Sequence, residues 1–103
     1  MTSGTAPESI TLKVAAASDS KSVARAIFKY HEEGRPIEIS AIGPGSVNQA
    51  VKAVAIAQEE FRQRGLEIAM LPAFETVHKD GERLSALRFQ VRIRPPDVEA
   101  PRS

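Results

Sequence analysis

Hydrophobic and polar positions alternate in two short segments of the first half of the chain, 10–15 and 37–41. A period of two is typical of a strand that buries one face, so the sequence predicts two strands there. Between them, apolar residues recur at helical spacing after the capping residues Asp19 and Ser20 and stop at Gly34. This spacing predicts an amphipathic helix that connects the two strands.

A second helix is predicted over 47–62, because apolar residues again recur every three or four positions and Gly65 follows them. These residues are Val47, Ala50, Val51, Val54, Ala57 and Phe61.

Two further strands follow. Pro72 indicates a bulge or a sheet edge in the first of them. Asp80-Gly81 is a strong hairpin signal, and the last strand returns over 83–94.

The predicted order is therefore βαβαββ. Two successive right-handed crossovers place both helices on one face of a mixed four-stranded sheet, which makes the fold an α/β, or α+β, two-layer sandwich. The opposite face has no helical cover. Seven polar side chains are expected on this outer face, namely those of Lys13, Glu38, Glu67, Arg88, Gln90, Arg92 and Arg94.

A glycine turn joins the second strand to the second helix, in the segment 41–53 with the sequence AIGPGSVNQAVKA. Gly43 and Gly45 can adopt dihedrals closed to other residues, and the Ser46 hydroxyl is expected to cap the helix. Free N–H groups at such a helix start can bind an anion such as a nucleic-acid phosphate. The same residues also fit a simple turn whose amides bind water, and they form neither a P-loop nor a dinucleotide fingerprint.

The segments AIGPGSVNQAVKAVAIA at 41–57 and LPAF at 71–74 resemble the stage V sporulation protein S family of small bacterial proteins, collinearly over about 10–94. The resemblance implies an Alba-like fold and a nucleic-acid-binding role in developmental control. It implies no known biochemical activity. One domain over 10–94 is expected, with flexible tails at 1–9 and 95–103.

Composition narrows the function classes. The 103 residues include no cysteine and two histidines far apart, His31 and His78, so no disulfide, thiol chemistry or metal site is expected. No catalytic motif is present, so we expect neither an enzyme nor a cofactor. The beginning lacks a signal-peptide pattern and no apolar run could span a membrane, which predicts a cytoplasmic protein. A net charge of +1 means that any nucleic-acid surface must be local.

The leading hypothesis is a small nucleic-acid-binding regulatory protein that contacts phosphates through the glycine turn and nearby basic residues, and that self-associates as a dimer or larger assembly. Its candidate DNA- or RNA-binding residues are Lys21, Arg25, Gly43, Gly45, Ser46, Asn48 and Lys52. Lys21, Arg25 and Lys29 also fit an ordinary solvated helix face. The alternative is a protein-interaction module without nucleic-acid binding, whose exposed sheet face or alanine-lined second helix mediates assembly. A weaker third possibility is a small ligand at the helix start.

The arginines of the outer face are a second potential phosphate-binding stripe. Arg88, Arg92 and Arg94 are more simply explained as cross-strand partners of Glu38 and Glu67. Because paired arginines attract phosphate poorly, we favour the ion pairs; only Arg94, near the end of the strand, escapes this objection. The hairpin tip could project into a groove, but its Asp80 and Glu82 weaken that possibility.

Overall fold

A computed structural model describes residues 7–96 and confirms the predicted βαβαββ order. Most of the two predicted tails, 1–9 and 95–103, lies outside the described residues. The elements in chain order are β1 (Ile10–Val14), α1 (Ser20–Glu32), β2 (Ile37–Ala41), α2 (Pro44–Gln63), β3 (Glu67–Lys79) and β4 (Glu82–Arg94).

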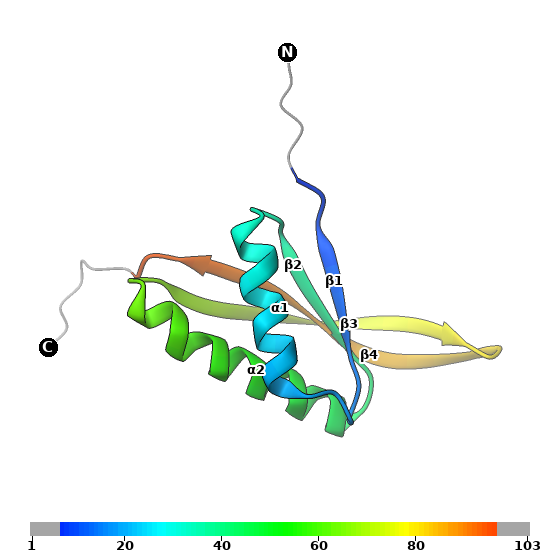
Figure 1. Ribbon diagram of the computed structural model, residues 1–103. Helices are drawn as coiled ribbons and strands as arrows, with labels where there is room; N and C mark the ends of the chain where they lie inside the picture. The colour runs from blue at the N-terminus through cyan, green and yellow to red at the C-terminus, as the bar shows by residue number, and fades with distance from the viewer. Residues whose placement is uncertain (1–6, 97–103) are drawn as a thin grey trace, which may run out of the picture.

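The four strands form one mixed sheet in the order β1-β2-β4-β3. β1 and β2 run parallel, whereas β4 pairs antiparallel with both β2 and β3. Both helices lie on the same face of this sheet (Figure 1). The two-layer architecture is therefore as predicted.

The core lies between the sheet and the two helices. Phe61 of α2, Ile27 of α1 and Ile39 of β2 are its largest fully buried side chains. Phe28 stacks on Phe61 with 4.1 Å between the ring centroids, and His31 meets the same ring edge-on. These aromatic contacts hold α1 against α2.

β3 and β4 extend well beyond the rest of the sheet as a two-stranded ribbon (Figure 1). β2 pairs with β4 only from Leu87 to Val91, so the parts of β3 and β4 nearer the hairpin have only each other as partners. β3 is an edge strand, which is why Pro72, which has no N–H group, is tolerated in its middle. Asp80 and Gly81 form the predicted turn with positive φ angles of 51° and 77°.

Candidate nucleic-acid interface

The start of α2 differs from the prediction. The helix begins at Pro44, three positions before the expected Val47, and its N-cap is Gly43. Gly43 has φ 90° and ψ 157°, a conformation that is essentially restricted to glycine. Proline at the first helical position needs no N–H partner, and its fixed φ suits the helix. Ser46 is thus not the cap: it is the third residue of α2 and is 6% exposed.

Gly45 has a different role from the one predicted. It lies within α2 and is not among the described glycines with positive φ. A Cβ atom at this position would lie 2.9 Å from the Cβ atom of Ala16 in the β1–α1 loop. One turn later, Gln49 Nε2 donates a hydrogen bond to the Ser18 carbonyl oxygen at 2.5 Å. The first turns of α2 therefore pack closely on the loop that precedes α1, through the close approach at Gly45 and the hydrogen bond of Gln49.

We expect Gly45→Ala to lower the free energy of unfolding by about 1–3 kcal/mol, because the added methyl group forces the loop and helix apart. The double variant Gly45→Ala/Ala16→Gly removes the Ala16 methyl group that the new methyl group would meet. The nearest remaining atom is the Cα atom of residue 16, at 3.7 Å, so the free energy of unfolding should largely return to the parental value. Urea unfolding of the parent, both single variants and the double variant measures this. An equal loss with and without Ala16→Gly would show that the close approach is not the cause.

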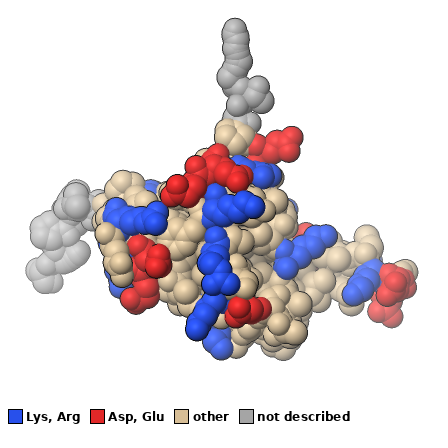
Figure 2. Space-filling model, in the orientation of Figure 1, with Lys and Arg blue, Asp and Glu red and all other residues tan. Residues whose placement is uncertain are grey.

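Exposed basic side chains form a column along α1 (Figure 2). Lys21, Arg25 and Lys29 are spaced by four residues, so they lie on one face of the helix; we call these three residues the α1 column. Lys21 lies in the first turn of α1. Lys52 is exposed on α2, one turn beyond Gln49, whose side chain contacts the β1–α1 loop. The start of α1 and Lys52 are thereby brought to one side of the molecule.

A hydrogen-bond network at the start of α1 changes the charge balance of the column. Asp19 is the N-cap and accepts hydrogen bonds from the Ser22 hydroxyl at 2.9 Å and the Lys21 backbone N–H at 3.4 Å. Arg25 Nη2 donates to the same Ser22 hydroxyl at 3.2 Å. The Ser22 and Lys21 hydrogen bonds, with a smaller contribution from the Arg25 charge, lower the pKa of Asp19 below its usual value. The ionised carboxylate therefore offsets part of the Arg25 charge.

The lysines are less constrained. Within residues 7–96, none of Lys21, Lys29 and Lys52 takes part in an ion pair. Lys29 lies with its Nζ 5.3 Å from the centre of the Tyr30 ring. The side-chain amines of these three lysines are therefore the groups of this surface that are best able to bind a phosphate.

The outer face of the sheet carries the charged side chains that alternation predicted. Arg88 forms an ion pair with Glu38 at 3.6 Å, as expected, and Arg92 donates to Gln90 at 3.0 Å. Glu67 lies directly opposite Arg94 in the register of β3 and β4. Internal partners thus occupy Arg88 and Arg92, which leaves the helix side as the better candidate phosphate surface.

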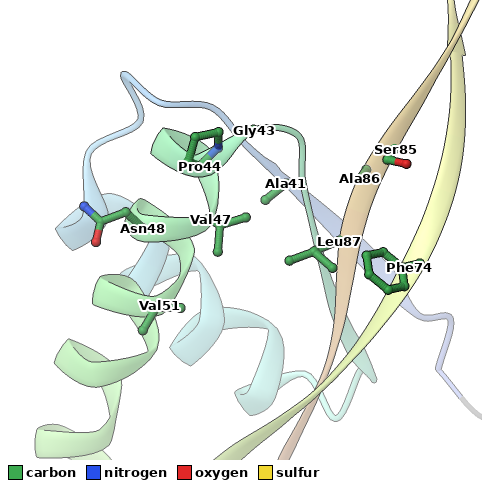
Figure 3. A pocket seen from close by; sticks show the side chains of 10 residues that line it. All are labelled: Ala41, Gly43, Pro44, Val47, Asn48, Val51, Phe74, Ser85, Ala86 and Leu87. Atoms are coloured by element: carbon green, nitrogen blue, oxygen red, sulfur yellow. The ribbon is translucent and has the colours of Figure 1, made fainter.

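An apolar groove on the helix side was not predicted. It has a volume of about 580 Å³ and lies between the first turns of α2 and the base of the ribbon. Figure 3 shows Val47 of α2 and Leu87 of β4 projecting from its two sides, with the Phe74 ring of β3 beyond Leu87. We call it the α2–β4 groove. Of the predicted residues, Gly43 and Asn48 are among those that line this groove.

The described part of the chain contains neither a metal-binding cluster nor a helix that could span a membrane. Across residues 7–96, no three His, Cys, Asp or Glu side chains come together in a way that could hold a metal ion. No helix in the same range combines the length and apolar character needed to cross a bilayer.

The sequence profile of the family described as stage V sporulation protein S matches residues 10–94. This span runs from the first residue of β1 to the last residue of β4. The chain belongs to the stage V sporulation protein S family. The resemblance seen in the sequence is thus confirmed, and the whole βαβαββ unit is the family domain of a small sporulation protein.

Proposed function

We propose that this member of the stage V sporulation protein S family is a small cytoplasmic regulator that binds DNA or RNA through the phosphate backbone and has no catalytic role. The position of three lysines supports this proposal: Lys21 and Lys29 lie on one face of α1, and Lys52 lies on the neighbouring helix. None of the three has an ion-pair partner within residues 7–96. Lysine amines bind phosphate as point charges and do not need a fixed geometry. Arg25 contributes less because the ionised Asp19 lies beside it.

The start of α2 adds to this surface in a modest way. Pro44 has no N–H group, so Gly45 and Ser46 supply the first amides of the helix, whose N-terminal end carries partial positive charge. Gly43 shapes the turn through its dihedral angles, and Ser46 is too buried for its hydroxyl to be a main contact. We therefore assign the phosphate contacts to the lysines first and to these amides second.

Binding through phosphates has a clear experimental signature. Affinity for labelled duplex DNA, duplex RNA and their single strands should be similar across unrelated sequences and should fall as salt rises. With three principal contacts, the slope of log K against log salt for duplex DNA should be about −3, at about −0.9 per phosphate. Fluorescence anisotropy from low to physiological salt measures this. Absence of binding to all four probes at low salt would overturn the proposal.

The second candidate function is a protein-interaction module that does not contact nucleic acid. The observation in its favour is the α2–β4 groove, whose rim residue Phe74 is 86% exposed. The net charge of +1 fits this function as well. A protein that shows no nucleic-acid binding in the titrations above would leave this as the better explanation.

A further inference from the structure

The outer face of the sheet contains a pocket at the place where the ribbon leaves the other strands. The pocket has a volume of about 690 Å³, within the range of about 300–1,000 Å³ that is usual for small-molecule sites. Its lining includes Lys13 of β1, Ser40 of β2 and three alternate residues of β3, namely Glu75, Val77 and Lys79. We call it the outer-face pocket.

The register of the sheet brings these side chains to one face. Lys13 pairs with Ser40, and Ser40 pairs in turn with Arg88 of β4. Glu75 lies opposite Ala86, two positions from Arg88, so it is on the same face of the sheet. β1 and β3 are the two edges of the sheet. A basic side chain from one edge and an acidic side chain from the other therefore line the same pocket.

Glu75 is the acidic group of the pocket, and its carboxylate lacks a donor. Its Oε1 atom is buried without a hydrogen-bond partner, the only such side-chain atom within residues 7–96. No ion pair in the same range includes Glu75. A buried acceptor without a donor is unfavourable. Because the side chain as a whole is only half-buried, the carboxylate can turn toward a donor that enters the pocket.

The rest of the lining supplies positive charge and an apolar surface. Lys13 and Lys79 are exposed and take part in no ion pair within residues 7–96. Val77 and Leu84 face each other across the ribbon, half-buried but outside the hydrophobic core. The pocket therefore suits a ligand that has an anionic group, an apolar or flat body and N–H donors.

We propose that the outer-face pocket binds a nucleoside monophosphate, with the phosphate beside Lys13 and Lys79 and the edge of the base against the Glu75 carboxylate. A phosphate monoester carries about −1.5 to −2 charges at pH 7, which the two lysines match. The flat base can lie on the apolar pair Val77 and Leu84. A ligand of this size also uses the volume of the pocket better than an amino acid would.

Guanine should be the preferred base because of the donors on its edge. Its ring N–H and its amino group are adjacent, so an ionised carboxylate, which only accepts, can receive both hydrogen bonds. Adenine and cytosine each place one amino group beside a ring nitrogen that is an acceptor and repels the carboxylate. Uracil has one N–H between two carbonyl oxygens. GMP should therefore bind more tightly than AMP, CMP or UMP.

This site does not rest on the proposed nucleic-acid binding. Both helices cover the opposite face of the sheet, so the α1 column and Lys52 lie away from the outer-face pocket (Figure 1). Glu75 also disfavours a continuous phosphate backbone here, whereas a ligand with one phosphate places its negative charge beside the lysines alone. Nucleotide binding is measured without DNA or RNA, so either proposal can fail while the other holds.

An NMR titration of the isotope-labelled chain at low salt tests the proposal. GMP should shift the amide signals of Lys13, Ser40 and residues 75–79, and AMP should bind roughly tenfold or more weakly. Guanosine lacks the phosphate and ribose 5-phosphate lacks the base, so each should bind far more weakly than GMP. Absence of GMP binding at about 5 mM, or equal binding of ribose 5-phosphate, would overturn the proposal.

Glu75→Gln is the sharpest variant, since it keeps the size of the side chain but replaces one acceptor oxygen with a donor. A glutamine amide can pair with an amino group and a ring nitrogen of adenine at the same time. The preference should therefore change from GMP to AMP. An unchanged ratio of the two affinities would reject Glu75 as the group that contacts the base, and with it the proposed site.

Lys13→Ala/Lys79→Ala should weaken GMP binding roughly tenfold or more, because the phosphate loses both of its amines. Arg62→Ala/Arg83→Ala is the matched control, since it removes the same charge from exposed residues that do not line the pocket. The control should bind GMP like the parent. Equal weakening in the two double variants would mean that net charge alone attracts the nucleotide, which would reject the pocket.

Discussion

Phe61→Ala should lower the free energy of unfolding by about 3–5 kcal/mol, the usual range for removing a large aromatic side chain from a core. Phe61 is 0% exposed, stacks on Phe28 and is met edge-on by His31. The substitution leaves a cavity between α1 and α2 that the surrounding backbone cannot close. Because the total stability of a small domain is about 5–15 kcal/mol, most of the native population could be lost on warming.

Phe74→Ala is a matched control for this effect, since it makes the same chemical change at an exposed site. Urea unfolding in dilute solution, where self-association is negligible, should show a change below about 0.5 kcal/mol for this variant. A Phe61→Ala loss that is no larger than the Phe74→Ala loss would show that Phe61 does not anchor the two helices. Loss of α1–α2 packing would also separate the α1 column from Lys52.

The order of elements could be predicted because each element has a strong local signal. Alternation over 10–15 and 37–41 identifies the strands, and Asp80-Gly81 fixes the hairpin. The sequence predicts a start of α2 that is three residues too late, because Gly-Pro-Gly has the composition of a turn. Pro44 in fact occupies the first helical position, where its lack of an N–H group costs nothing.

The surface features depended on contacts that no local pattern encodes. The need for glycine at position 45 comes from Ala16, which is distant in sequence and approaches only in the folded chain. Alternation could place Phe74 on the helix side of β3, but it could not show that α2 leaves this part of the strand uncovered. The α2–β4 groove therefore became visible only once the helix and the ribbon were placed together.

The triple variant Lys21→Ala/Lys29→Ala/Lys52→Ala should bind DNA and RNA roughly 10- to 100-fold more weakly at low salt, with the salt slope reduced by about 2–3 for duplex DNA. The reason is that these three lysines have no ion-pair partner within residues 7–96, so each can replace a counterion on the phosphate backbone. Arg25→Ala alone should have a smaller effect than Lys21→Ala, because Asp19 already offsets part of its charge.

Removing three positive charges also changes the overall field of the protein, so the control must make the same change elsewhere. Arg88→Ala/Arg92→Ala/Arg94→Ala removes the same charge from the outer face, where Arg88 is paired with Glu38 and Arg92 with Gln90. Anisotropy titrations, with circular dichroism to confirm folding, should show near-parental binding for this control. Equal losses in both triple variants would mean that net charge governs binding. Parental binding in both would remove Lys21, Lys29 and Lys52 from the interface, because phosphate contacts cannot survive the loss of the amines that make them.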